Sequence, residues 1–174
     1  IQPSRAVTLT GGHPPSHSNF LDIIGMIKSN YPYLKWIVAN TTLDRITTTK
    51  PITPDYIVEM KNRGLNRLLV MVPTLDPSEY RYIRIRNAVQ SHPPDLCRVL
   101  DNIDAALELG FTIDISYIDF GLPNQRLEQV YDYFLQRAIK YPLQLGPFEL
   151  QKLVAIGEGK NYLDSISEPS RKEL

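Results

Sequence analysis

The segment from residue 6 to residue 24, AVTLTGGHPPSHSNFLDII, places two glycines and a histidine directly after a short apolar run. Because glycine has no Cβ, Gly11 and Gly12 let the chain turn sharply and let a ligand approach the peptide N–H and C=O groups. His13 and Pro14 follow in the same turn. An isolated Gly-Gly pair also suits a plain tight turn, and the G-x-G-x-x-G spacing of a dinucleotide-binding loop is not present. The turn is therefore a candidate binding site, with a purely structural role as its alternative.

A metal site at the histidines is a second chemical possibility. His13 and His17 stand four residues apart, a spacing that binds metal when both side chains lie on one helical turn. Pro14 and Pro15 lie between them, and consecutive prolines disfavour a helix. We therefore expect turn or capping roles for these histidines and assign no metal. The spacing of Ser, His and acidic residues indicates no triad, so catalytic residues stay unassigned.

The composition is that of a globular chain with one core, since 43% of the 174 residues are hydrophobic. Nineteen Lys and Arg balance nineteen Asp and Glu, so no net field attracts nucleic acid or an anionic membrane. Apolar runs such as LLVMV are far shorter than the ~20 residues of a membrane span. We therefore expect neither a nucleic-acid partner nor a membrane partner.

One cysteine, Cys97, excludes an internal disulfide and any iron–sulfur cluster held by three or four cysteines of these residues. It lies beside the apolar stripe of a predicted helix, where we expect it to be buried. The chain begins Ile-Gln-Pro, without an initiator methionine or a signal region. We expect a fragment or a processed form, located in the cytoplasm.

The elements that must position the Gly-Gly turn alternate along the chain. Short apolar runs predict strands at 6–10, 34–39, 67–72, 112–118 and 143–150. Helical spacing of apolar residues predicts helices over 20–27, 96–107 and 127–138, and another over 54–62 with Thr53 as N-cap. Strands begin about every 30 to 45 residues, as in βαβ units with right-handed crossovers. The fold class is α/β, either an open doubly wound sheet or part of a (β/α) barrel.

In both architectures ligands bind beyond the C-terminal ends of parallel strands. The segments to examine are therefore 10–15, 40–43, 73–76 and 119–124. Asp76 stands three residues before Glu79 and Asn124 precedes an amphipathic stretch, so each is also expected to cap a helix. We divide the chain into a domain over 1–156 and a polar C-terminal tail over 157–174.

Several segments resemble the radical SAM superfamily, in order and in register. The stretch VTLTGGHPPSHSNFLDIIGMIKSNYPYLKWIVANTT resembles the region around that family's GGEP motif, where a strand ends in Gly-Gly-Glu-Pro. VMVPTLDPSEYRYIR is similar to the SLD segment after the following strand. VLDNIDAALELGFTIDISYIDFGLPNQRLEQVYDYF is similar to the next helix, strand and helix of the family. The resemblance covers residues 5 to about 140.

The resemblance implies a parallel-stranded, TIM-like partial (β/α) barrel that is incomplete at its N-terminus. In the family a [4Fe–4S] cluster binds S-adenosylmethionine and cleaves it reductively to a 5′-deoxyadenosyl radical, the hard chemistry being the cofactor's. Positions carried over from the family comprise Gly11, Gly12, His13 and Pro14 at the methionine amino end, Asn40, Thr74 and Asp76 near the ribose and sulfonium, Arg84 near the carboxylate, and Asn124 at the exit of the next strand.

The sequence departs from the family pattern at the cluster and at the GGEP motif. The Cys-x3-Cys-x2-Cys motif belongs to the loop after the barrel's first strand, whereas the first strand here corresponds to the family's second. His13 stands where the family has Glu, and a neutral imidazole offers an ammonium group one acceptor without charge assistance. Thr74 stands where Ser is commoner and keeps the hydroxyl.

We therefore expect a fragment or truncated form of a radical-SAM-type enzyme that binds S-adenosylmethionine at the C-terminal ends of the strands, with the [4Fe–4S] cluster only in an intact parent. A degenerate, non-catalytic scaffold or partner-binding subunit is one alternative. An unrelated α/β domain that binds a phosphate ligand at the Gly-Gly turn is another. The substrate, a small molecule or a peptide, is not assigned. Unpaired edges of a partial barrel predict self-association or a partner subunit.

Overall fold

The computed structural model describes residues 5–47, 50–85, 94–119 and 124–152. Its strands are β1 (Ala6–Leu9), β2 (Trp36–Thr41), β3 (Arg67–Met71), β4 (Thr112–Asp119) and β5 (Leu145–Lys152). Its helices are the 3₁₀ turn η1 (Pro14–Ser16), α1 (Phe20–Asn30), α2 (Pro54–Asn62), α3 (Pro77–Ile85), α4 (Leu96–Glu108) and α5 (Asn124–Lys140). Each strand lies within two residues of its predicted ends. The proposed tail over 157–174 lies outside the described residues.

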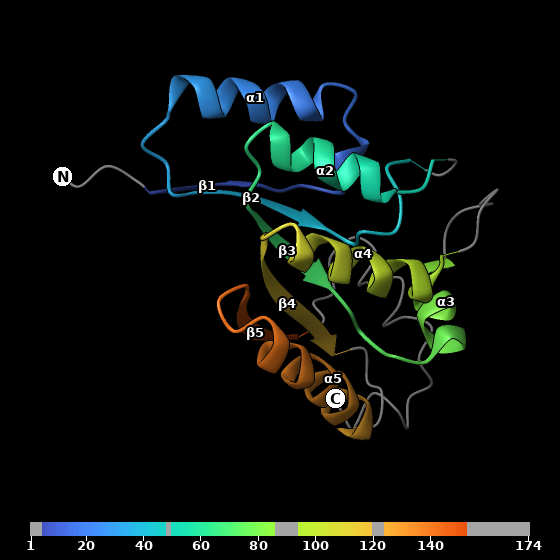
Figure 1. Ribbon diagram of the computed structural model, residues 1–174. Helices are drawn as coiled ribbons and strands as arrows, with labels where there is room; N and C mark the ends of the chain where they lie inside the picture. The colour runs from blue at the N-terminus through green and yellow to red at the C-terminus, as the bar shows by residue number, and fades with distance from the viewer. Residues whose placement is uncertain (1–4, 48–49, 86–93, 120–123, 153–174) are drawn as a thin grey trace.

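All five strands are parallel and lie in one sheet in the order β1-β2-β3-β4-β5. Strands that follow one another along the chain are therefore neighbours, without the reversal of order that defines a doubly wound sheet. Figure 1 shows the helices following the curve of the sheet, from α1 beside β1 and β2 to α5 beside β4 and β5. The expected α/β partial barrel is confirmed.

One hydrophobic core lies between the sheet and the helices. Alternate strand residues such as Ile37, Leu68 and Ile113 point into it, because successive side chains of a strand face opposite sides. Helices close the core with Ile24 of α1 and Val99 of α4, which are fully buried. The predicted N-cap of α2 is also confirmed, since the Thr53 side chain accepts a hydrogen bond from the N–H of Tyr56 at 3.3 Å.

The predicted burial of Cys97 is wrong. Cys97 is exposed, because its neighbours Leu96 and Val99 occupy the core-facing positions of α4. On α5, Val130 and Phe134 are buried whereas Tyr131 is 48% exposed.

The face of the sheet away from this core carries an ion pair. Arg67 of β3 donates to both carboxylate oxygens of Asp114 on β4, at 2.7 and 2.9 Å, and its guanidinium lies 5.2 Å from the Trp36 ring. The hydrogen bond to Asp114 raises the pKa of Arg67. Gly146 of β5 leaves room for the pair, since a Cβ there would lie 1.9 Å from an oxygen of Asp114. The pair ties β3 to β4 and requires glycine on β5.

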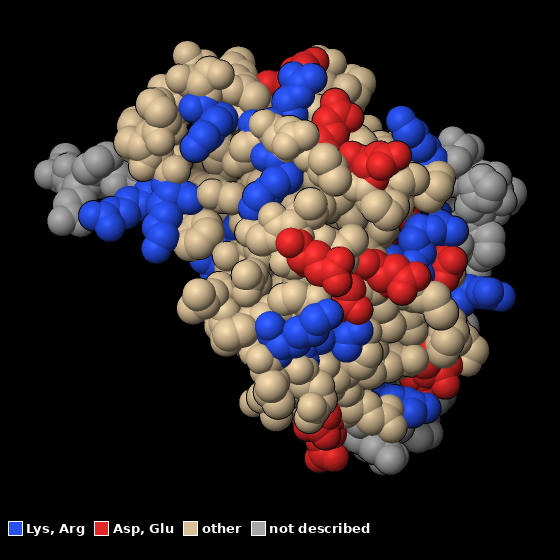
Figure 2. All heavy atoms as spheres, in the orientation of Figure 1, with Lys and Arg blue, Asp and Glu red and all other residues tan. Residues whose placement is uncertain are grey.

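Charges of both signs are interspersed on the surface seen in Figure 2, in keeping with equal numbers of basic and acidic residues. None of the described helices combines the length and the apolar character needed to cross a membrane.

Candidate functional site

The parallel sheet brings the C-terminal ends of β1, β2 and β3 to one edge. Leu9 pairs with Ala39, and Asn40 pairs with Leu69. The Gly-Gly turn, Asn40 and the segment that begins the β3–α3 connection therefore follow three adjacent strands. We call this region the ligand edge.

The Gly-Gly turn is open to solvent. Gly11 has φ of 98° and Gly12 has φ of 58°, values that favour glycine over any residue with a side chain. Both residues are exposed, and a Cβ built on either would find no atom within 4 Å. A ligand therefore has room to reach the peptide groups of the turn.

His13 reaches across to the connection between β2 and α2. Its Nε2 lies 2.5 Å from the backbone carbonyl oxygen of Arg45. Because a carbonyl only accepts hydrogen bonds, Nε2 must carry the proton and donate it. The glutamate carboxylate that the family places here could not make this bond when ionised. Pro14 begins η1, and His17 Nδ1 accepts from the N–H of Asn19 at 3.1 Å, which confirms its turn role.

The described part of the β2–α2 loop, residues 42–47 and 50–53, is attached to α4 by hydrogen bonds and an ion pair. The Asn102 side chain donates to the carbonyl of Leu43 at 2.7 Å and to that of Ile52 at 3.1 Å. Asp44, 1% exposed, accepts from the N–H of Asp95 at 3.4 Å and lies 3.8 Å from the Arg98 guanidinium. Both ends of the loop and one buried charge within it are thus held by the same helix.

Thr74 and Asp76 build the start of α3. The buried Thr74 hydroxyl donates to Glu79 at 2.7 Å and accepts from the N–H of Asp76 at 3.1 Å. One carboxylate oxygen of Asp76 accepts from the N–H groups of Ser78 and Glu79, at 2.8 and 3.0 Å. The Ser78 hydroxyl and the Glu79 amide lower the pKa of Asp76 by stabilising its charged form. The predicted capping role of Asp76 is confirmed.

Arg126 joins this cap to α5. It donates from Nε and Nη2 to one carboxylate oxygen of Glu79, at 3.1 and 2.9 Å, and lies 4.0 Å from Asp76. No motif in the sequence indicated Arg126. Asn102 did leave a signal, because it is a polar residue on a helix face whose other members are apolar.

The remaining predicted residues are Asn40, Arg84 and Asn124. Asn40 is half-buried, and its side chain makes no hydrogen bond within the described part of the chain. The Thr42 hydroxyl is buried and likewise has no hydrogen-bond partner among the described residues. Arg84 lies in the last turn of α3 and Asn124 is the first residue of α5, but the side chains of both lie outside the description.

This arrangement leaves room for a ligand but does not fit an iron–sulfur cluster. The Gly-Gly turn is open, and the buried Thr42 hydroxyl has no hydrogen-bond partner among the described residues, which suits a ligand that carries donors and acceptors. The single cysteine, Cys97, lies in the first turn of α4 and is exposed, and one thiolate cannot hold a cluster.

The sequence model of the Radical SAM superfamily matches residues 1–134. A GTP 3′,8-cyclase from Alkaliphilus oremlandii is 29% identical over 157 residues, which are 90% of this chain and 42% of that protein. A GTP 3′,8-cyclase from Shewanella denitrificans is 31% identical over 161 residues, or 91% of this chain and 41% of that protein. The chain thus spans about two-fifths of the length of these relatives.

Solved structures share the fold at low sequence identity. Coproporphyrinogen III oxidase from Escherichia coli, a radical SAM enzyme, superposes with a TM-score of 0.62 at 17% identity, over 95% of this chain and 36% of that one. A maturase of the [FeFe]-hydrogenase superposes with a TM-score of 0.60 at 15% identity, over 98% and 37%. The parallel sheet, the glycine turn at its edge and the match over residues 1–134 lead to one conclusion: the chain belongs to the radical SAM superfamily.

Proposed function

We propose that the ligand edge is the S-adenosylmethionine site of a longer radical SAM enzyme. The observation that carries the proposal is the exposed Gly11-Gly12 turn, whose backbone conformation and empty surroundings leave its peptide groups open to a ligand. Family membership supports it, because members of the superfamily use S-adenosylmethionine with a [4Fe–4S] cluster as their source of radical chemistry. The contribution of this chain is to bind and orient the cofactor.

The residues divide into those that meet the ligand and those that hold the edge in shape. The peptide groups of Gly11 and Gly12 receive the methionine amino end. Asn40, whose side-chain amide makes no hydrogen bond to the residues that the structure describes, meets the ribose side. Thr74 and Asp76 act mainly through the cap of α3, because their oxygens bond within that cap. Cluster cysteines must come from elsewhere in the longer protein, since these residues contain one cysteine.

A non-catalytic, scaffold-like relative is the second candidate, and His13 is the observation that favours it. Its Nε2–H is directed to Arg45, so the side chain does not stand in for the family's glutamate as a charged acceptor. The third possibility, an unrelated phosphate-binding domain, is removed by membership of the family.

Calorimetric titration of the chain with S-adenosylmethionine tests the proposal. We expect saturable binding that weakens about tenfold, or about 1.4 kcal/mol, when Asn40→Ala removes one amide contact. Gly12→Val should also weaken binding, because a side chain would fill the open turn and strain its backbone. Gly25→Ala is the matched control, since a Cβ at Gly25 in α1 meets only ordinary contacts at 3.8 Å.

The same titration with GTP examines the ligand named by the curated relatives. Absence of S-adenosylmethionine binding by the wild-type chain would reject the proposal in favour of the scaffold. Equal affinities of the wild type and Asn40→Ala would show that the ligand binds elsewhere.

A further inference from the structure

We propose that Asn102 of α4 is a positioning residue for the ligand edge: it fixes the β2–α2 loop, and this loop in turn holds His13 and the Gly-Gly turn. The mechanical part of this inference depends only on contacts within the chain. Its effect on ligand affinity rests on the proposed function.

The first link is the buried amide of Asn102. Asn102 is 2% exposed and lies beside the core residues Val99 and Ile103 of α4. A polar group at such a position is unfavourable unless it is hydrogen-bonded. Both of its bonds go to carbonyls of the β2–α2 loop, at Leu43 and Ile52. One side chain therefore closes both ends of the loop on α4.

The second link is the conformation of the loop itself. Leu43 has φ of 55°, which a branched side chain rarely adopts, so the surrounding contacts must hold it there. Its N–H donates to the Thr41 hydroxyl at 3.0 Å, and the N–H of Ile52 donates to the carbonyl of Asp44 at 3.1 Å. These bonds hold the described residues on either side of Arg45, so its carbonyl is presented in one direction.

The third link is the bond from His13 Nε2–H to that carbonyl. A glutamate at this position, ionised at neutral pH, would place a carboxylate against a carbonyl oxygen, and both groups only accept hydrogen bonds. The histidine is therefore the residue that allows the turn and the loop to be joined. Helix α4, the loop and the turn then form one connected unit, here called the brace, beside the ligand edge. Asn102 acts on His13 only through the loop, since its side-chain amide donates to Leu43 and Ile52.

The variant Asn102→Leu removes both donors while keeping a buried side chain of similar size. We expect exchange of the Ile52 amide to accelerate at least tenfold, and the His13 imidazole to lose its fixed Nε2–H tautomer in nitrogen NMR spectra. Affinity for S-adenosylmethionine should fall about tenfold. Ile103→Val, at the next and equally buried position, is the matched control. It should leave the His13 signal and the affinity unchanged.

A double-mutant cycle of Asn102→Leu and His13→Ala tests whether the two residues act through the loop or affect ligand affinity independently. Distant sites with no shared partner contribute additively, so coupling through the loop predicts that the double variant binds little worse than either single variant. Additive losses of affinity would overturn the inference. So would an Asn102→Leu protein that is less stable overall but keeps the wild-type His13 signal and loop exchange.

Two further outcomes remain decisive. If Asn102→Leu does not fold, His13→Ala alone must accelerate exchange of the Ile46 amide in the loop, and an unchanged rate overturns the inference. If the wild-type chain does not bind S-adenosylmethionine while the loop and His13 still respond to Asn102→Leu, the brace stands and only the proposed function falls.

Discussion

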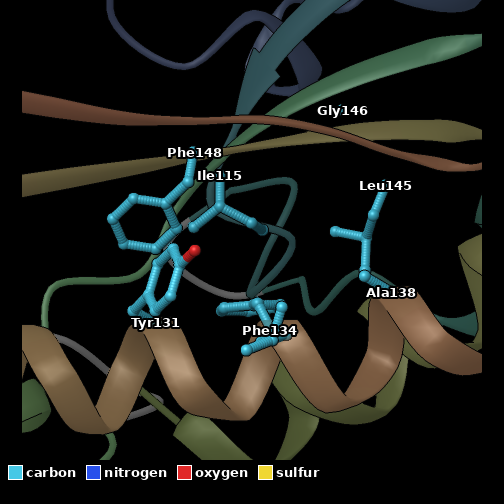
Figure 3. Close-up of a pocket in the computed structure, with 8 residues that line it drawn as sticks. Ile115, Tyr131, Phe134, Ala138, Leu145, Gly146 and Phe148 are labelled. Atoms are coloured by element: carbon cyan, nitrogen blue, oxygen red, sulfur yellow. The ribbon is translucent and has the colours of Figure 1, made fainter. Parts of the chain in front are cut away.

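The ligand edge over β1 to β3 and the other end of the sheet, at α5 and β5, differ in how their buried surfaces are made up. At the ligand edge, buried polar groups such as Asn102 and Thr74 are matched to specific partners across loops. At the other end, a pocket of about 370 Å³ lies between α5 and β5. Figure 3 shows its lining side chains, with Tyr131 and Phe134 of α5 directed toward Phe148 and Ile115 of the strands.

The helix beside this pocket carries a second apolar stripe. Tyr131, Leu135 and Ile139 recur at four-residue intervals and are 48%, 46% and 74% exposed. A helix that packs only on a sheet needs one such stripe, so the second stripe indicates a further neighbour.

This difference between the two regions follows from the difference between hydrogen bonding and the hydrophobic effect. A buried polar group is unfavourable until it finds a partner in the right direction, so Asn102 and Thr74 are hydrogen-bonded to particular groups of the fold. Apolar surface is unfavourable in proportion to its area and accepts any complementary cover. A second copy or a partner subunit can supply that cover.

The largest expected effect contrasts two neighbours on α5. Phe134 is 3% exposed and Leu135 is 46% exposed, although both line the pocket. We expect Phe134→Ala to lower the free energy of unfolding by about 4 kcal/mol, and Leu135→Ala by less than about 1 kcal/mol. Urea denaturation measures both. Equal losses would show that the pocket side is already covered in solution.

A second variant tests the junction between the two regions. In Gly146→Ala the new Cβ would collide with Asp114, so either β5 shifts or the bond to Arg67 breaks. We expect a loss of about 3 kcal/mol in the same assay. Gly25→Ala is the control, because its Cβ has room, and it should be neutral or slightly stabilising. A neutral Gly146→Ala would mean that Gly146 of β5 does not pack against the Asp114 carboxylate in this register.

The third prediction concerns the association of two copies of the chain, with little change in the free energy of unfolding. The exposed stripe of α5 predicts that the chain forms dimers at micromolar concentration in sedimentation velocity. Leu135→Glu should shift it to monomers, because a carboxylate would be buried in the contact. Met26→Glu, at a 58% exposed position on α1, should leave association unchanged. Loss of association in both variants would show that the dimers depend on the apolar surface as a whole and not on the α5 stripe.

The sequence predicted the elements well because strands buried on both faces and amphipathic helices have distinct periods. It also predicted the cap at Asp76, since capping depends on residues a few positions apart. It did not reveal the bond from His13 to Arg45 or the pairing of Arg126 with Glu79, which join residues 32 and 47 positions apart. Such contacts depend on how loops fold over the edge, and no local pattern encodes that.

The ligand edge should also respond to acid, whereas the α5–β5 pocket should not. The pKa of Asp76 lies below its usual value, so its charged form stabilises the folded state above the unfolded pKa and this contribution is lost as the pH falls through the lowered value. We expect the amides of Ser78 and Glu79 to lose protection from exchange below about pH 4. Among the described residues no carboxyl group lines the pocket, so amides beside Phe134 should keep their protection over the same range. In Asp76→Asn the acid response at Ser78 should disappear, and its persistence would assign the effect to another carboxylate.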